Sequence, residues 1–129
     1  MEVKIPVSLG ELFDKVSILE IKSEKISDKT KLNHIKKELD SLKEIINKLN
    51  IEENKIEPLF KKLKFTNSEL WVIEDEIRVL EKNNDFGENF VKLARSVYIT
   101  NDKRFEIKNN LNVLFNSEIK EQKSYEKYK

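Results

Sequence analysis

The stretch that decides the fold is residues 56–80, IEPLFKKLKFTNSELWVIEDEIRVL. Its seam positions recur at alternating intervals of three and four residues: Ile56, Leu59, Leu63, Thr66, Leu70, Ile73, Ile77 and Leu80. Side chains at that spacing share one face of a long amphipathic helix. We predict a helix over residues 56–82, with Pro58 in the first turn, where its missing amide costs least. Residues 66–69 also fit a capping box, but the heptad register continues through them and favours one helix.

A second seam precedes this helix. Residues 29–49 carry apolar side chains at 3-4-3-4-3 spacing, as in a coiled coil: Leu32, Ile35, Leu39, Leu42, Ile46 and Leu49. Asp28 can cap the start of this helix, and the polar residues 50–55 indicate a turn after it. Two long seams joined by a short turn predict an antiparallel helical hairpin on which the other helices pack.

Three further helices are expected around that hairpin. Residues 8–26 form an amphipathic helix that opens with a Ser8–Glu11 capping box. Residues 86–98 form a shorter helix, and the cap-forming run Thr100, Asn101, Asp102 starts another over 102–116. The predicted fold is therefore all-α, a helical bundle of about five helices, with residues 117–129 as a charged tail that either frays or docks.

Composition limits the class of protein. The 129 residues suit one helical domain over 1–129, and two glycines with two prolines are too few for an all-β fold. The 25 basic and 24 acidic residues nearly cancel, which argues against nucleic acid as a partner. There is no cysteine, no apolar run long enough for a membrane span, and no leader pattern at the N-terminus. We expect a cytoplasmic protein without a membrane partner.

Three segments carry polar side chains that suggest more than solvated helix faces. The candidate binding site comprises Glu11, Asp14, Lys15 and Lys22 of the first segment, Trp71, Glu74, Asp75 and Arg78 of the second, and Arg95, Tyr98, Asn101, Asp102, Arg104 and Lys108 of the third. If they act together, the segments must converge in one pocket. Their alternative interpretation is as caps, rim packing and intrahelical ion pairs, of which Glu74 with Arg78 has the usual i,i+4 spacing.

Two sites within this set have a specific chemistry. Glu11 and Asp14 are three residues apart on one helix face and are the candidate ligands for Mg²⁺, although a cap followed by intrahelical ion pairs is the favoured interpretation of the two residues. A helix start at residues 101–102, flanked by Arg95 and Arg104, would offer backbone amides and guanidinium groups to a small anionic ligand. The adjacent carboxylate of Asp102 opposes such an anion.

No residue stands out as catalytic. The single histidine, His34, lies in a lysine-rich surface stretch, so neither a catalytic triad nor a zinc site is expected. The sequence also lacks a glycine-rich phosphate loop. These observations favour a protein that is not an enzyme, while an enzyme that relies on carboxylates, lysine and arginine alone remains an alternative.

Four strings resemble an uncharacterised bacterial and phage family, known only as a domain of unknown function. They are VSLGELFDKVSILEIKSEKI (7–26), LWVIEDEIRVLE (70–81), DFGENFVKLARSVYITNDKR (85–104) and SEIKEQKSYEKY (117–128). The resemblance implies a link to surface-polysaccharide or glycosyltransferase pathways, and brings no catalytic residues.

Two functional hypotheses follow. The first is a helical interaction or accessory protein that self-associates or binds a protein partner through its heptad seams. The second is a protein with a small-molecule site, which either binds its ligand or acts on it as a Mg²⁺-dependent enzyme. Carboxylate and arginine side chains would hold a phosphosugar or nucleotide between helices.

Overall fold

Four α-helices follow one another in the part of the chain that the computed structural model describes, residues 1–115 and 124–128. They are α1 (Leu9–Lys25), α2 (Lys29–Lys48), α3 (Glu53–Lys82) and α4 (Glu88–Leu114). No strand occurs among these residues, which confirms the prediction of an all-α protein. The count of about five helices was one too many for the described chain.

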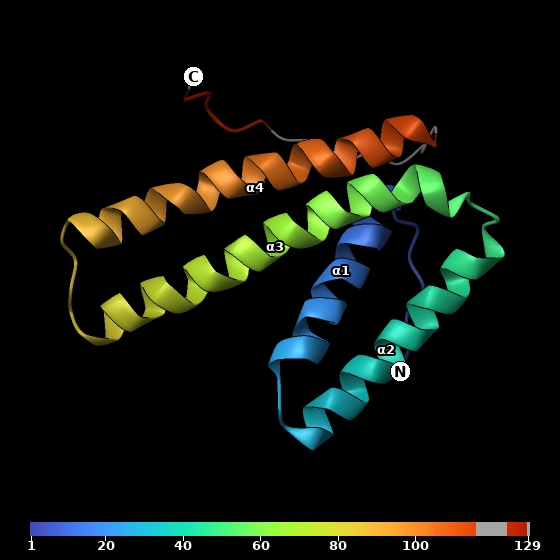
Figure 1. Cartoon of the computed structure of the whole chain (residues 1–129), viewed down its shortest axis with the longest axis horizontal. Helices are drawn as coiled ribbons and strands as arrows, with labels where there is room; N and C mark the ends of the chain where they lie inside the picture. The colour runs from blue at the N-terminus through green and yellow to red at the C-terminus, as the bar shows by residue number, and fades with distance from the viewer. Residues whose placement is uncertain (116–123, 129) are drawn as a thin grey trace.

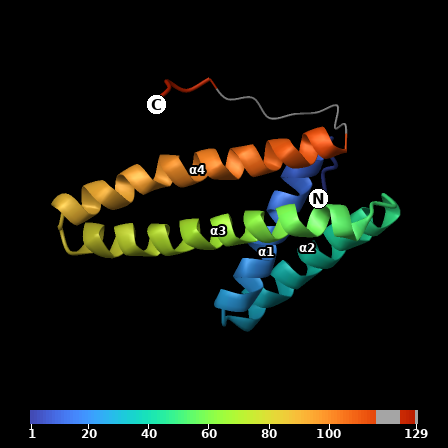
Figure 2. The same cartoon turned by 45° about the horizontal axis from the view of Figure 1, so that its top comes forward.

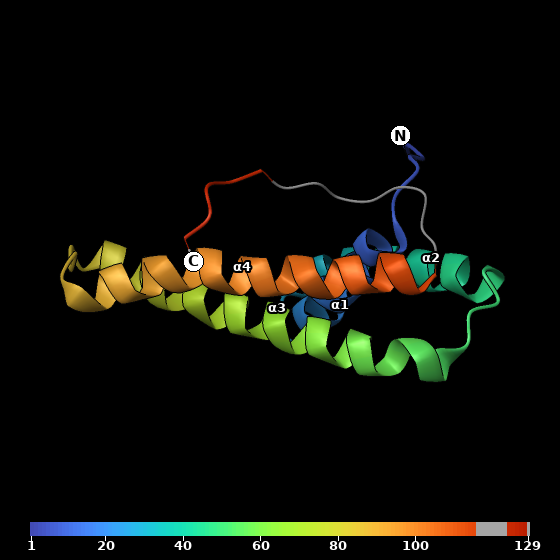
Figure 3. The ribbon, with the colours of Figure 1, turned by 90° about the horizontal axis from the view of Figure 1, so that it is seen from above.

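Helices α3 and α4 lie antiparallel and side by side along their whole lengths (Figure 1). Helix α1 crosses one end of this pair and contacts α2, α3 and α4, while α2 packs along the outer side of α1. The other end of the α3–α4 pair extends beyond α1 and α2, as Figures 2 and 3 show from two further directions. We call residues 71–99 the arm, and the four-helix remainder, residues 8–70 and 100–115, the base.

The long antiparallel hairpin therefore exists, but its partners differ from those predicted. The hairpin of residues 29–49 with 56–82 is wrong, because the backbones of α2 and α3 do not approach each other. Only three residues, 26–28, separate α1 from α2, so these two helices must fold back on each other. The seam of α2 is buried at Ile35 and Leu39, which pack on Val16 and Leu19 of α1.

The predicted break at residues 99–101 is also wrong, since α4 runs through it without interruption. The polar side chains that suggested a cap make tertiary contacts instead. Thr100 is buried, and the Asp102 carboxylate hydrogen-bonds with the phenol of Tyr128. Because the amides of residues 101 and 102 lie inside a helix, the anion site expected at a helix start there does not form.

Helix α3 is continuous across residues 66–69, as the heptad register predicted. The Thr66 hydroxyl donates to the carbonyl of Lys62, 2.9 Å away, and so bonds within the helix. The helix starts at Glu53, three residues before the predicted start, which moves Pro58 out of the first turn. At the other end, Asn84 has a φ of 54°, a left-handed conformation that asparagine adopts readily after a helix.

The apolar core lies within the base. One cluster joins Phe13, Ile56, Leu63 and Leu111 from α1, α3 and α4, and the other joins α1 to α2. Within the described residues, no helix is long and apolar enough to cross a membrane. The predicted tail, 117–129, falls largely outside the described residues, although Tyr128 is described and its ring packs edge-on against Tyr98.

Candidate functional site

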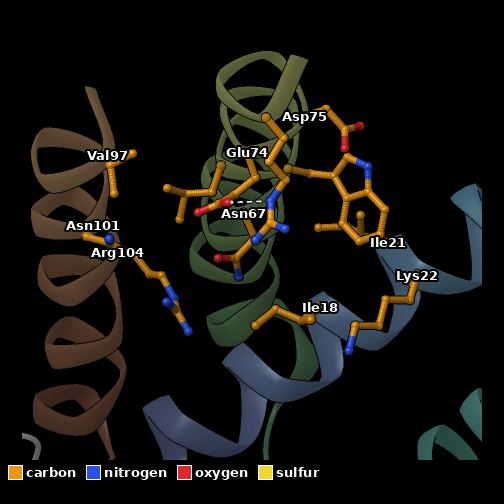
Figure 4. Close-up of a pocket in the computed structure, with 12 residues that line it drawn as sticks. Ile18, Ile21, Lys22, Asn67, Glu74, Asp75, Val97, Asn101 and Arg104 are labelled. Atoms are coloured by element: carbon orange, nitrogen blue, oxygen red, sulfur yellow. Dashed lines mark hydrogen bonds and ion pairs between the residues drawn. The ribbon is translucent and has the colours of Figure 1, made fainter. Parts of the chain in front are cut away.

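A cleft of about 680 Å³ lies where the arm meets the base. Three helices line it, with Ile18, Ile21 and Lys22 from α1, Asn67, Leu70, Trp71, Glu74, Asp75 and Arg78 from α3, and Val97, Asn101 and Arg104 from α4. In Figure 4 the Arg104 side chain reaches from α4 toward Asn67 and Ile18, and Lys22 lies on the α1 side. The cleft thus has an aliphatic lining with charged and amide groups around it.

The buried carboxylate of Asp14 holds two of the residues that line the cleft, Asn67 and Arg104. Asp14 is only 1% exposed, and its Oδ1 accepts hydrogen bonds from Asn67 Nδ2 at 2.8 Å and from Arg104 Nε at 3.0 Å. Its Oδ2 accepts from the Nη2 of the same guanidinium. This two-pronged pairing fixes the plane of Arg104 from a second helix, as planar arginine–carboxylate pairs generally do.

A second ion pair continues this network away from the cleft. The buried Lys108 ammonium donates to Glu11 Oε2 at 2.8 Å and lies 3.7 Å from Asp14 Oδ2. The two acids and two bases (Asp14, Glu11, Arg104 and Lys108) balance in charge. Buried charges are tolerated only when they are paired in this way, because an isolated one would lose its hydration without compensation.

Helix α1 approaches α4 very closely beside this network. The amide of Gly10 donates to Asn112 Oδ1 at 2.7 Å, which satisfies an amide at the start of α1 that has no partner within its own helix. A Cβ atom on Gly10 would lie 2.4 Å from the backbone carbonyl oxygen of Lys108. The predicted cap is half formed, because Ser8 Oγ accepts from the Glu11 amide at 3.1 Å while the Glu11 carboxylate bonds to Lys108.

The three polar segments meet in part. Seven of the candidates line the same cleft: Lys22, Trp71, Glu74, Asp75, Arg78, Asn101 and Arg104. Three more form the network behind it: Glu11, Asp14 and Lys108. The remaining candidates lie elsewhere. Lys15 pairs with Glu38 of α2 at 2.9 Å, and Arg95 is exposed on α4.

Tyr98 and Asp102 face the C-terminal segment rather than the cleft. Desolvation raises the pKa of the Tyr128 phenol above its usual 10.0, and the hydrogen bond and negative charge of Asp102 add to this effect. Both interactions favour the protonated phenol. These two candidate residues therefore have a described role in holding residue 128 against α4.

The proposed Mg²⁺ ligands, Glu11 and Asp14, already face Lys108 and Arg104. A cation at this pair would have to displace both of these side chains. No group of three or more potential metal ligands occurs among residues 1–115 and 124–128.

Sequence reasoning missed several residues that shape the site. Asn67 was assigned only to a possible helix cap, yet it is 6% exposed and joins Asp14 to the cleft. Ser17 is fully buried and its Oγ accepts from Asn67 Nδ2 at 2.8 Å. The available signal was the polar pair at residues 66–67, which interrupts an otherwise apolar seam.

Fold and site together define a small helical protein with a solvent-open cleft backed by a buried ion-pair network. A family model described as "Family of unknown function (DUF6165)" matches residues 1–128, and the chain belongs to this family. The match also covers residues 28–54, which none of the four strings quoted above includes. No curated protein and no solved structure matches the chain.

Proposed function

We propose that this protein binds a small polar molecule carrying an anionic group, a phosphosugar or nucleotide, in the cleft between α1, α3 and α4. The amide oxygen of Asn67 carries this proposal. Both hydrogen bonds of its nitrogen go to Asp14 and Ser17, and no donor reaches its oxygen among the described residues. This oxygen is not among the buried polar atoms without a partner, so solvent in the cleft reaches it. A hydroxyl or N–H group of a ligand would take the place of water there, with a net gain of about 0.5–1.5 kcal/mol.

The lining of the cleft suits a molecule with one apolar face. The half-buried Trp71 indole and the aliphatic side chains of Ile18 and Ile21 offer flat and apolar contacts. Glu74 and Asp75 offer acceptors for hydroxyl groups at the exposed side. Sugars and nucleosides combine an apolar face with hydroxyl groups at the edge, which is the combination that such a pocket recognises.

Lys22 is the group best suited to receive the anion. Its ammonium makes no ion pair with any described residue, whereas Arg78 pairs with Glu74 and Arg104 with Asp14. A phosphate or carboxylate near Lys22 would gain a charge-assisted hydrogen bond without first breaking an existing pair. The other cations of the cleft would then supply a weaker, longer-range attraction.

This function is one of binding, and an accessory role in surface-polysaccharide pathways would be consistent with it. Phosphosugars and nucleotide sugars are the usual substrates of such pathways. The family resemblance implied a link to these pathways. A Mg²⁺-dependent variant of the proposal remains testable, because Asp75 and a bound phosphate could share a cation.

The direct test is a thermal-shift and calorimetric titration with glucose 1-phosphate, UDP-glucose, glucose and inorganic phosphate, each with and without Mg²⁺. A ligand at 100 times its Kd should stabilise the fold by about 2.7 kcal/mol. We expect a phosphorylated sugar to bind more tightly than either glucose or phosphate alone. If none of the four probes binds at millimolar concentration, the proposal fails for this ligand class.

Two matched variants assign the binding to the cleft. Lys22→Gln should weaken the binding of the phosphorylated probe roughly tenfold, the effect of losing one charged hydrogen bond. Lys25→Gln, an exposed lysine on the same helix and outside the cleft, should leave it unchanged. Trp71→Ala should weaken glucose and glucose 1-phosphate alike. Equal losses for the two lysine variants would place the binding elsewhere.

A further inference from the structure

Helix α3 has a second apolar face, extending from the base into the arm, that no other described helix covers. Phe65, Val72 and Val79 follow each other along it at seven-residue intervals and are 68%, 47% and 55% exposed, and Phe86, 53% exposed, lies in the loop after the helix. On α3 this stripe is distinct from the one facing the cleft, on which Trp71, Glu74 and Arg78 follow each other at helical spacing. Large half-exposed side chains repeating along one face are typical of an interaction surface.

A shallow groove accompanies the stripe. It encloses about 490 Å³ between α3 and α4, and its lining comes from these two helices alone: Asp75, Glu76, Val79, Leu80, Asn89, Lys92 and Leu93. The acidic residues stand on the α3 side of the groove, and Lys92 stands on the α4 side, where it also pairs with the exposed Glu88 of its own helix at 3.4 Å. Among its lining residues the groove therefore has an apolar floor with carboxylates on one side and an ammonium on the other.

We infer that this face of the arm binds a second copy of the same chain. In the symmetric arrangement we propose, a two-fold axis runs parallel to the helices, so that α3 of each copy lies over α4 of the other. Glu76 lies six residues before the end of α3 and Lys92 four residues after the start of α4. At about 1.5 Å per residue, the two positions differ in height by only about 3 Å. Each copy's acidic side thus faces the other's Lys92.

The alternative two-fold axis, perpendicular to the helices, would place α3 over α3. The Asp75–Glu76 edge would then have no basic edge of α4 opposite it. With either axis α1 and α2 stay on the outer faces of the assembly, because they pack on the side that carries the cleft. The cleft shares Asp75 with the groove, and its other lining residues stay outside the contact in both copies.

The available area is enough for a weak dimer. Residues 65–82 of α3 span about 27 Å, and two helices side by side are about 20 Å wide. The resulting ~540 Å² of flat area per copy is below the ~800 Å² of a standard stable interface. We therefore expect association that depends on concentration rather than a permanent dimer.

Charge-reversal variants test the arrangement in sedimentation velocity over a wide range of protein concentration. Glu76→Lys places a lysine on each side of the groove, and Lys92→Glu places carboxylates on both sides. Each variant alone should raise the dimer Kd at least roughly tenfold. An equimolar mixture of the two should restore dimers, because each side then meets its opposite charge on the other chain. No interaction within a single chain can produce that recovery.

A variant that places a charge in the apolar contact tests that contact. Val79→Glu should also raise the Kd at least roughly tenfold, whereas Val113→Glu, an equally exposed valine of α4 outside the groove, should leave it unchanged. Circular dichroism of every variant reports whether the helices are intact. Three results would overturn the inference: a wild-type chain that stays monomeric at millimolar concentration, a mixture that does not recover, or a Val79→Glu variant that dimerises normally.

Discussion

The base and the arm use polar residues in opposite ways. The base holds the two buried charged side chains of the described residues, Asp14 and Lys108, and each pairs with a residue of another helix, as Asp14 does with Arg104. In the arm, charged side chains pair within one helix and stay exposed, as Glu74 does with Arg78. The buried pairs specify how helices meet, while the exposed pairs only support a helix that is already formed.

The apolar residues show the same contrast along one helix. The α3 seam is fully buried at Leu63, where α1 and α4 both pack on it, and is only partly buried at Leu80, where α4 alone does. Two helices have one interface between them, so they cannot bury more than one stripe each. We conclude that most of the folding free energy lies in the base, and that the arm opens locally at lower cost.

The largest difference should come from matched aspartates. Asp14→Ala leaves Arg104 and Lys108 without their shared carboxylate and should lower the free energy of unfolding by about 3–5 kcal/mol. Asp75→Ala, on the exposed surface of the arm, should change it by no more than about 0.5 kcal/mol. Urea denaturation of both variants measures the difference. Similar effects at the two positions would remove the distinction between base and arm.

Matched leucines on the same seam should differ by less. Leu63→Ala creates a cavity at a fully buried position and should cost about 3–4 kcal/mol. Leu80→Ala removes a partly buried side chain that water can replace, so about 1–2 kcal/mol is expected. Urea midpoints at constant m-value provide the comparison. A larger loss for Leu80→Ala would mean that the arm carries the main core.

The two glycines give the next smaller contrast. Gly10→Ala forces a methyl group against the Lys108 backbone and should cost about 1–3 kcal/mol, because backbone atoms cannot rotate away. Gly87→Ala meets nothing closer than 3.4 Å and should stay within about 0.5 kcal/mol. Thermal unfolding of the two variants tests this pair. If Gly10→Ala were neutral, α1 and α4 could not approach as closely as described.

The sequence predicted the helices better than their partners. Heptad spacing located α2 and α3 because a buried stripe must repeat with the helical period. The same spacing carries no information on which helix covers the stripe, and for that reason residues 29–49 were assigned to the wrong neighbour. The length of the 26–28 link was the stronger evidence, since three residues leave little choice of direction.

The role predicted from the sequence was wrong for polar residues that make contacts with distant parts of the chain. Asp102 is a good helix cap in isolation, but here it bonds to a tyrosine 26 positions away, which spacing along the chain cannot reveal. Asn67 and Asn112 were overlooked for the same reason, because asparagines are common on helix surfaces and their burial depends on the helix packed against them. The candidate site was therefore predictable as three segments, but the residue that best supports ligand binding was not.

The smallest effect, and the most informative for the cleft, concerns the Glu74–Arg78 pair at its rim. Their side chains are 52% and 79% exposed, with Arg78 Nε 3.2 Å from Glu74 Oε2. A double-mutant cycle with Glu74→Ala and Arg78→Ala should give a coupling energy of only about 0.3–0.5 kcal/mol, as for other exposed i,i+4 pairs. The same cycle repeated with a phosphorylated sugar bound should give a different value, because a ligand anion would compete with Glu74 for Arg78. An unchanged coupling would show that Arg78 takes no part in binding, and would leave Lys22 as the cation on which recognition of the anion depends.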